Sequence, residues 1–160
     1  MDCFHHSIMI SEGDLVPKFE VNDANGDKVK SSDFKGKKHV IYFYPKDFTP
    51  GCTTEADEFS RDYKKFQKQG IEIIGISPDD VDSHKKFCEK MNIPYPLLAD
   101  TDKTVSKAFG VWGLKKFMGR EYMGVNRSTF LVDEKGKIFK VFPKVKPKGH
   151  SEEVLEELAK

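Results

Sequence analysis

The chain has 160 residues, enough for one domain with a sizeable buried core. Its 27 basic and 26 acidic residues nearly balance, which argues against a nucleic-acid-binding protein, and no run of about 18 apolar residues predicts a membrane span. Residues 1–12 lack the pattern of a signal peptide and are expected to be irregular. We therefore expect a cytoplasmic protein whose three cysteines, Cys3 among them, are reduced by default.

The first part of the chain predicts a hairpin, a strand and a helix. Residues 19–34 alternate around the turn-rich cluster "DANGD" and predict a β-hairpin. Residues 39–44 form a nearly continuous apolar run, typical of a central strand that is covered on both faces. Apolar residues then recur three and four apart, which predicts a helix from Cys52 to Gln69 that Gly70 closes.

The middle of the chain repeats this alternation. Residues 71–77 predict a second buried strand, and residues 79–93 predict a second helix with its apolar side chains on one side. A short extended piece is expected at residues 95–100. A short helix should follow at residues 102–110, as an insertion before the next strand.

The last part of the chain predicts a loop, two strands and a closing helix. Residues 111–126, rich in glycine, lysine and aromatics, predict a mobile loop. Residues 128–143 predict two strands joined by "DEKG", and residues 151–160 predict a helix capped by Ser151. This order of elements predicts a single α/β domain over residues 1–160, with a thioredoxin-like fold, an N-terminal hairpin extension and an inserted helix.

The stretch "YPKDFTPGC" places Cys52 where a loop becomes a helix. The thiolate is the reactive form of cysteine, and the free N–H groups and dipole at a helix start favour an anion. Pro45 and Pro50 stiffen the approach, and Gly51 is expected to let the backbone turn sharply. The hydroxyl of Thr49 suits a small polar substrate. If each residue is considered alone, Thr49 could equally be a turn or cap residue, and Cys52 could equally be a small buried apolar residue.

The spacing of Pro45, Thr49 and Cys52 resembles the peroxiredoxin signature. "FYPKDFTPGCTTEA" and "GVNRSTFLVD" resemble its bacterioferritin-comigratory, or Q-type, subfamily over about residues 13–160. The resemblance implies that Cys52 is the peroxidatic cysteine, which attacks the peroxide O–O bond and becomes a sulfenic acid. It also implies that Thr49 binds the peroxide, Pro45 shields the pocket and Arg127 stabilises the thiolate. The implied substrates are hydrogen peroxide and organic hydroperoxides, the implied reductant is thioredoxin or a similar dithiol, and the implied state is a monomer.

A second thiol must resolve a sulfenic acid. Many members of the subfamily carry it five residues after the first, where this chain has Asp57, and some carry it in the second helix, where this chain has Cys88. The resemblance thus implies a Cys52–Cys88 disulfide. Because a helix rises about 1.5 Å per residue, Cys88 is expected too far along its helix to bond without partial unwinding. The alternative is that Cys88 is a core residue and that an external thiol reduces Cys52.

Other features leave alternatives open. Glu55, one helical turn after Cys52, either orients an arginine through an ion pair or merely suits the helix dipole. A thioredoxin-type oxidoreductase would need a cysteine at that position, whereas a non-catalytic redox-signalling or binding protein on this fold is not excluded. Histidine spacing and glycine motifs indicate neither a metal nor an organic cofactor. Four apolar residues could either form a rim that admits organic hydroperoxides or pack at the edge of the core: Phe48, Trp112, Phe117 and Met123. For Trp112 the core position is preferred.

Overall fold

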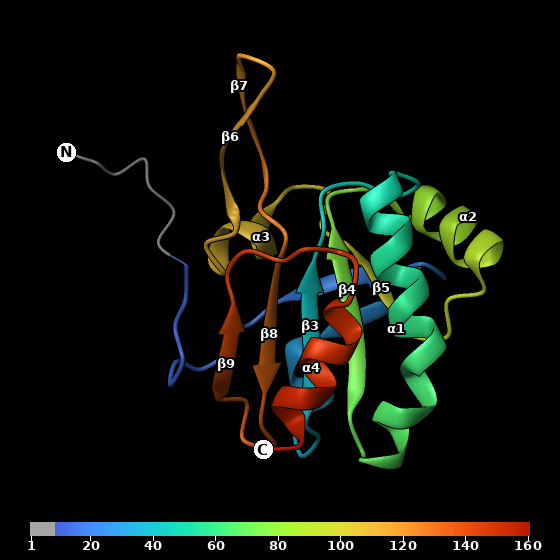
Figure 1. Cartoon of the computed structure of the whole chain (residues 1–160), viewed down its shortest axis with the longest axis vertical. Coiled ribbons are helices and arrows are strands. Elements are labelled where there is room, and N and C mark those ends of the chain that lie inside the picture. Colours follow the sequence, from blue (N-terminus) through green and yellow to red (C-terminus); the bar gives the residue numbers. More distant parts are fainter. Residues whose placement is uncertain (1–8) are drawn as a thin grey trace.

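The computed structural model describes residues 9–160 (Figure 1). Its main sheet consists, within this range, of β1 Glu20–Asp23, β2 Lys28–Lys30, β3 His39–Phe43, β4 Glu72–Ser77, β5 Leu97–Ala99, β8 Ser128–Val132 and β9 Ile138–Phe142. The spatial order is β2, β1, β5, β4, β3, β8, β9. β3, β4 and β5 run parallel at the centre, and almost all of their residues are buried, as is usual for parallel strands covered on both faces. β8 runs antiparallel to β3, with Ser128 opposite Phe43.

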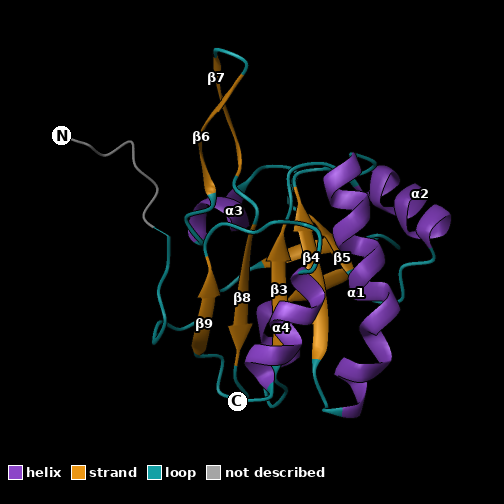
Figure 2. Cartoon of the chain, viewed as in Figure 1, coloured by secondary structure: helices purple, strands orange, loops and turns teal. Residues whose placement is uncertain are grey.

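Helices cover both faces of this sheet (Figure 2). α1 (Pro50–Lys68), α2 (Val81–Met91) and α4 (His150–Leu158) lie on one face. The 3-10 helix η1 (Ser31–Phe34) and the short α3 (Thr104–Ala108) lie on the other. Since β3 and β4 are parallel neighbours, the helices that follow them, α1 and α2, both begin at the same edge of the sheet.

The core consists of two apolar clusters, one on each face of the sheet. The alternation of β3 divides them: Val40 and Tyr42 face α1 and α2, whereas Ile41 and Phe43 face α3. Tyr44, just past the strand, joins the first cluster and is 1% exposed. Cys52 packs in this same cluster, so the proposed nucleophile is anchored in the core rather than placed on a free loop.

The predicted hairpin at residues 19–34 and the inserted helix at residues 102–110 are confirmed as β1–β2 and α3. α1 begins at Pro50, two residues before the predicted start, because proline is well suited to the first helical position. The predicted cap of α4 is wrong: Gly149 precedes the helix, and Ser151 instead donates to Asp62 Oδ2 at 2.9 Å. The irregular end predicted for residues 1–12 lies mostly outside the described residues, as does Cys3.

The loop predicted for residues 111–126 is instead a β-hairpin. β6 (Trp112–Phe117) and β7 (Arg120–Val125) pair antiparallel in register from Trp112 opposite Val125 to Phe117 opposite Arg120. Met118 and Gly119 form the turn with φ of 52° and 79°, the positive values of a type I′ turn. The hairpin projects from the body of the protein at the edge where α1 and α2 begin (Figure 1).

Candidate active site

Cys52 is the third residue of α1, after a short loop from the end of β3. Thr49 precedes the helix in an extended conformation, and the Thr53 N–H donates to its carbonyl at 2.9 Å. The N–H groups of Gly51 and Cys52 therefore come before the first α-helical hydrogen bond and point out of the helix start. Cys52 itself is 1% exposed. The sulfur of Cys52 therefore lies beside free N–H donors at the start of the helix and outside bulk water.

Arg127 supplies such a contact. It immediately precedes β8, and the pairing of Ser128 with Phe43 brings it beside the loop that leads to Cys52. Its Nη2 donates to Cys52 Sγ at 3.4 Å, and its Nη1 donates to Glu55 Oε1 at 2.7 Å. Burial lowers the pKa of Arg127, but the neighbouring Glu55 and Cys52 outweigh this effect and raise the pKa above its usual range. The guanidinium is thus a permanent cation that spans the sulfur and a carboxylate.

Glu55 is completely buried and shares one helix face with Cys52. Burial raises the pKa of Glu55 to about 7, and the ion pair with Arg127 opposes that rise. Its second oxygen, Oε2, is buried and has no hydrogen-bond partner among the described residues. The sequence left two roles open for Glu55, and the structure contains the ion pair with Arg127 that the first of them requires.

Gly51 has a different role from the predicted one. Its φ is not positive, so no sharp turn requires a glycine there. A Cβ at this position would lie 3.0 Å from Arg127 Nη2 and 3.2 Å from Pro147 Cγ. The missing side chain therefore makes room for the guanidinium beside the sulfur. The backbone strain lies instead at Phe48, whose φ is 66°.

Thr49 and Pro45 lie on the same loop as expected. Thr49 is half-buried, and its hydroxyl donates to the Lys46 carbonyl at 2.8 Å. This bond uses the hydroxyl proton, so the oxygen lone pairs remain to accept a hydrogen bond. Pro45 is half-buried directly after Tyr44.

Cys88 is not part of this constellation. It is the eighth residue of α2, half-buried, and packs against the cluster that contains Phe87. Burial, followed by the nearby carboxylates of Asp47, Asp23 and Glu89, raises the pKa of the Cys88 thiol to about 11. Cys52 and Cys88 are both free thiols in this structure.

Of the predicted apolar rim, Phe48, Phe117 and Met123 are exposed, the latter two on the β6–β7 hairpin. Trp112 is half-buried against the core, as preferred from the sequence. The hairpin also brings Lys115, which the sequence did not single out. Burial and the Arg127 charge lower the pKa of Lys115, whereas Cys52 raises it, so this second cation lies within electrostatic reach of the sulfur.

A polar cluster that the sequence did not predict consists of Asp47, Asp79 and His84. Their potential ligand atoms lie within 4.8 Å of one another, as in a metal site. Hydrogen bonds already bring these groups together, since Asp47 and His84 are hydrogen-bonded at 2.7 Å and the Asp79 side chain accepts the Asp47 N–H at 2.8 Å. Both signals were in the sequence: Asp47 lies within "PKDFTPGC", and His84 is a polar residue in an apolar helix stripe.

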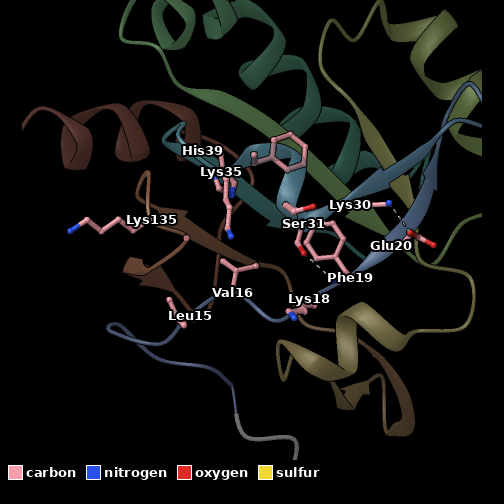
Figure 3. A pocket seen from close by; sticks show the side chains of 13 residues that line it. Leu15, Val16, Lys18, Phe19, Glu20, Lys30, Ser31, Lys35, His39 and Lys135 are labelled. Carbon is pink, nitrogen blue, oxygen red and sulfur yellow. Dashed lines mark hydrogen bonds and ion pairs between the residues drawn. The ribbon is translucent and has the colours of Figure 1, made fainter.

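A cavity of about 780 Å³ lies elsewhere, near the beginning of β3 (Figure 3). It is lined by Phe19, Phe34 and His39 among others, with Lys18 and Lys135 at its margin. None of the residues expected to act on a peroxide lines it. Within residues 9–160, no helix combines the length and apolar character needed to span a membrane.

Comparison with known proteins agrees with this geometry. The AhpC/TSA family pattern matches residues 13–141. Peroxiredoxin Bcp from Bacillus subtilis is 49% identical over 149 residues, which cover 93% of this chain and 95% of that protein. Peroxiredoxin Bcp from Escherichia coli is 41% identical over 146 residues, which cover 91% and 94%.

Two solved structures extend the comparison to the fold. Peroxiredoxin Q from Xanthomonas campestris matches with a TM-score of 0.84 and 39% identity over 88% of this chain and 89% of that one. A PrxQ mutant from Xylella fastidiosa matches with a TM-score of 0.89 and 35% identity, over 96% and 97%. The predicted thioredoxin-like fold of the peroxiredoxin type is confirmed. The chain therefore belongs to the AhpC/TSA family, as a peroxiredoxin of the Bcp/PrxQ kind and hence a thiol-dependent peroxidase.

Proposed function

We propose that Cys52 is the residue that reduces the peroxide. Its thiolate attacks one oxygen; the S–O bond forms as the O–O bond breaks, and the departing oxygen takes up a proton to become water or an alcohol. The observation that carries this proposal is the guanidinium of Arg127, which donates to Cys52 Sγ at 3.4 Å while Glu55 holds it at 2.7 Å. A fixed cation there stabilises the thiolate and the charge that develops on the departing oxygen.

The neighbouring residues have complementary roles in this proposal. Thr49 accepts the O–H of the peroxide, because its own proton is committed to the Lys46 carbonyl. Arg127 acts as the donor from the other side. Glu55 is a positioning residue that fixes the guanidinium, and Pro45 shields the pocket from water.

Cys88 is the proposed resolving thiol. Its sulfur displaces the oxygen of the Cys52 sulfenic acid, which yields a Cys52–Cys88 disulfide and water. With a pKa of about 11, the half-buried Cys88 is almost entirely in the unreactive thiol form while α2 is folded. Unwinding of α2 would both carry Cys88 toward Cys52 and return it to water. Position 57, the other place where a thiol was considered, carries an exposed aspartate.

The remaining steps follow from this chemistry. Thioredoxin or a similar dithiol would reduce the disulfide and return the enzyme to its starting state. The substrates would be hydrogen peroxide and organic hydroperoxides, with exposed Phe48 offering an apolar contact to the latter. The two free cysteines of the described chain suit a reducing compartment, so we place the protein in the cytoplasm. The resemblance to the subfamily supports a monomer.

Peptide mass mapping after one equivalent of hydrogen peroxide tests this proposal. We expect a Cys52–Cys88 link in the wild type and in the matched control Cys3→Ser, but only oxidised Cys52 in Cys88→Ser. A reduced Cys52 in all three proteins would contradict the assignment of Cys52. Oxidised Cys52 without a bridge would contradict the role of Cys88 and leave reduction to an external thiol.

A further inference from the structure

A buried polar cluster joins the loop that carries Thr49 to α2. Asp47 is 3% exposed and His84 is fully buried. The side chain of Asp47 makes three hydrogen bonds. It accepts from the Tyr44 hydroxyl at 2.7 Å and from Ser83 Oγ at 2.8 Å, and its Oδ2 is hydrogen-bonded to His84 Nδ1 at 2.7 Å. Two of these partners, Ser83 and His84, belong to the first two turns of α2. The contact between Asp47 and these two residues is named the α2 clamp below.

The hydrogen bonds of His84 use both of its ring nitrogens. Its Nδ1 faces Asp47 Oδ2 at 2.7 Å, and its Nε2 faces the Leu98 carbonyl at 2.9 Å. Because a carbonyl oxygen only accepts, Nε2 carries a proton and donates it to Leu98. Both ring nitrogens are therefore hydrogen-bonded inside the protein. Breaking the contact between Asp47 and His84 inside the protein would leave buried polar atoms without a partner, which is more costly than losing a hydrogen bond at the surface.

The position of the clamp connects the two thiol-bearing parts of the chain. His84 lies four residues before Cys88, one turn earlier in the same helix. Asp47 lies two residues before Thr49 on the loop that leads to Cys52. Between them, the ring of Phe48 packs edge-on against Phe87 with 5.0 Å between centroids. α2 cannot unwind through its second turn without breaking this contact.

We propose that His84 is a positioning residue for the peroxidase cycle, and that its buried hydrogen bond with Asp47 sets how readily α2 opens to release Cys88. This inference rests on the proposed resolving role of Cys88. While the clamp is closed, α2 is folded and Cys88 is withheld from the Cys52 sulfenic acid. Once it opens, Cys88 reaches the sulfenic acid, and the disulfide and water form. The clamp thus controls the second chemical step and leaves the first one to Arg127 and Thr49.

The test compares His84→Asn with two matched controls. Lys85→Asn introduces the same residue at the next, exposed position of α2. His150→Asn removes another buried histidine that contacts a carboxylate, Glu153, but lies in α4. The first readout is amide hydrogen exchange of reduced protein at residues 87–91. We expect exchange there about tenfold faster or more in His84→Asn than in either control. Equal exchange in His84→Asn and His150→Asn would overturn the proposal.

The second readout separates the two chemical steps by quenched flow and mass spectrometry. In His84→Asn, disulfide formation should accelerate about tenfold, whereas formation of the sulfenic acid should change less than threefold. Slowing of both steps together would mean a merely structural role and overturn the proposal. If the wild type forms no Cys52–Cys88 disulfide, the resolving role fails, and hydrogen exchange still decides the clamp. If His84→Asn does not fold, Ser83→Ala, which removes one bond to Asp47, should give the same pattern at about threefold.

Discussion

Gly51→Ala should separate catalysis from stability at this site. The new Cβ would lie 3.0 Å from Arg127 Nη2, about 0.4 Å short of the 3.4 Å at which ordinary contact begins. It cannot move the other way, because Pro147 Cγ is at 3.2 Å. The guanidinium must therefore shift while Glu55 holds its other nitrogen, and its 3.4 Å hydrogen bond to Cys52 Sγ is the contact that gives way.

The expected size of the effect follows from that one contact. A hydrogen bond to a charged group contributes about 1.5–3 kcal/mol, and each ~1.4 kcal/mol is a factor of ten in rate. The second-order rate constant for oxidation of Cys52 by hydrogen peroxide should therefore fall at least about tenfold. Stability should change by less than about 1 kcal/mol, since alanine is a better helix former than glycine.

Competition with a reporter peroxidase measures the rate constant, and urea unfolding measures stability. Thr54→Ala, at an exposed position in the same turn, is the matched control and should keep the wild-type rate. A folded Gly51→Ala protein that reacts within twofold of the wild type would refute the assigned role of the Arg127–Cys52 contact.

Two further predictions concern the residues around the sulfur. Thr49→Val should lower the rate constant for peroxide about tenfold while Thr49→Ser keeps most of it, because only the hydroxyl can accept from the peroxide; equal rates in both variants would contradict this. The pKa of Glu55 is about 7 in the folded protein and ordinarily 4.5, so between these pH values the folded state binds more protons than the unfolded state. The free energy of unfolding should therefore fall by about 3 kcal/mol as the pH rises through that window. Urea unfolding at pH 4.5 and pH 8 should show a smaller fall in Glu55→Gln; an unchanged fall would refute the assignment.

The loop and helix around Cys52 were predictable because their signals are local. Proline, threonine and glycine mark the loop, and apolar residues at helical spacing mark α1. Arg127 is 75 residues from Cys52, and the sequence placed it only through the family motif. The physical cause is the register of β8 on β3, which a single sequence does not contain.

The parts that the sequence missed depend on tertiary contacts or weak turns. The β6–β7 hairpin turns at Met118 and Gly119, which lack the Asn-Gly pattern that usually marks a type I′ turn. Gly51 is explained only once Arg127 and Pro147 are seen on either side of it. The pairing of Asp47 with His84 joins residues 37 positions apart on separate elements, and neither residue alone indicates a partner in the sequence.

Single-turnover consumption of hydrogen peroxide by fully reduced protein tests the central claim most directly. The wild type and Cys88→Ser should each consume one equivalent per Cys52 at similar rates, because the first step needs only Cys52 and its neighbours. Cys52→Ser should consume none. Consumption by Cys52→Ser at the wild-type rate, or an inert wild type, would contradict the assignment of Cys52 as the residue that reduces the peroxide.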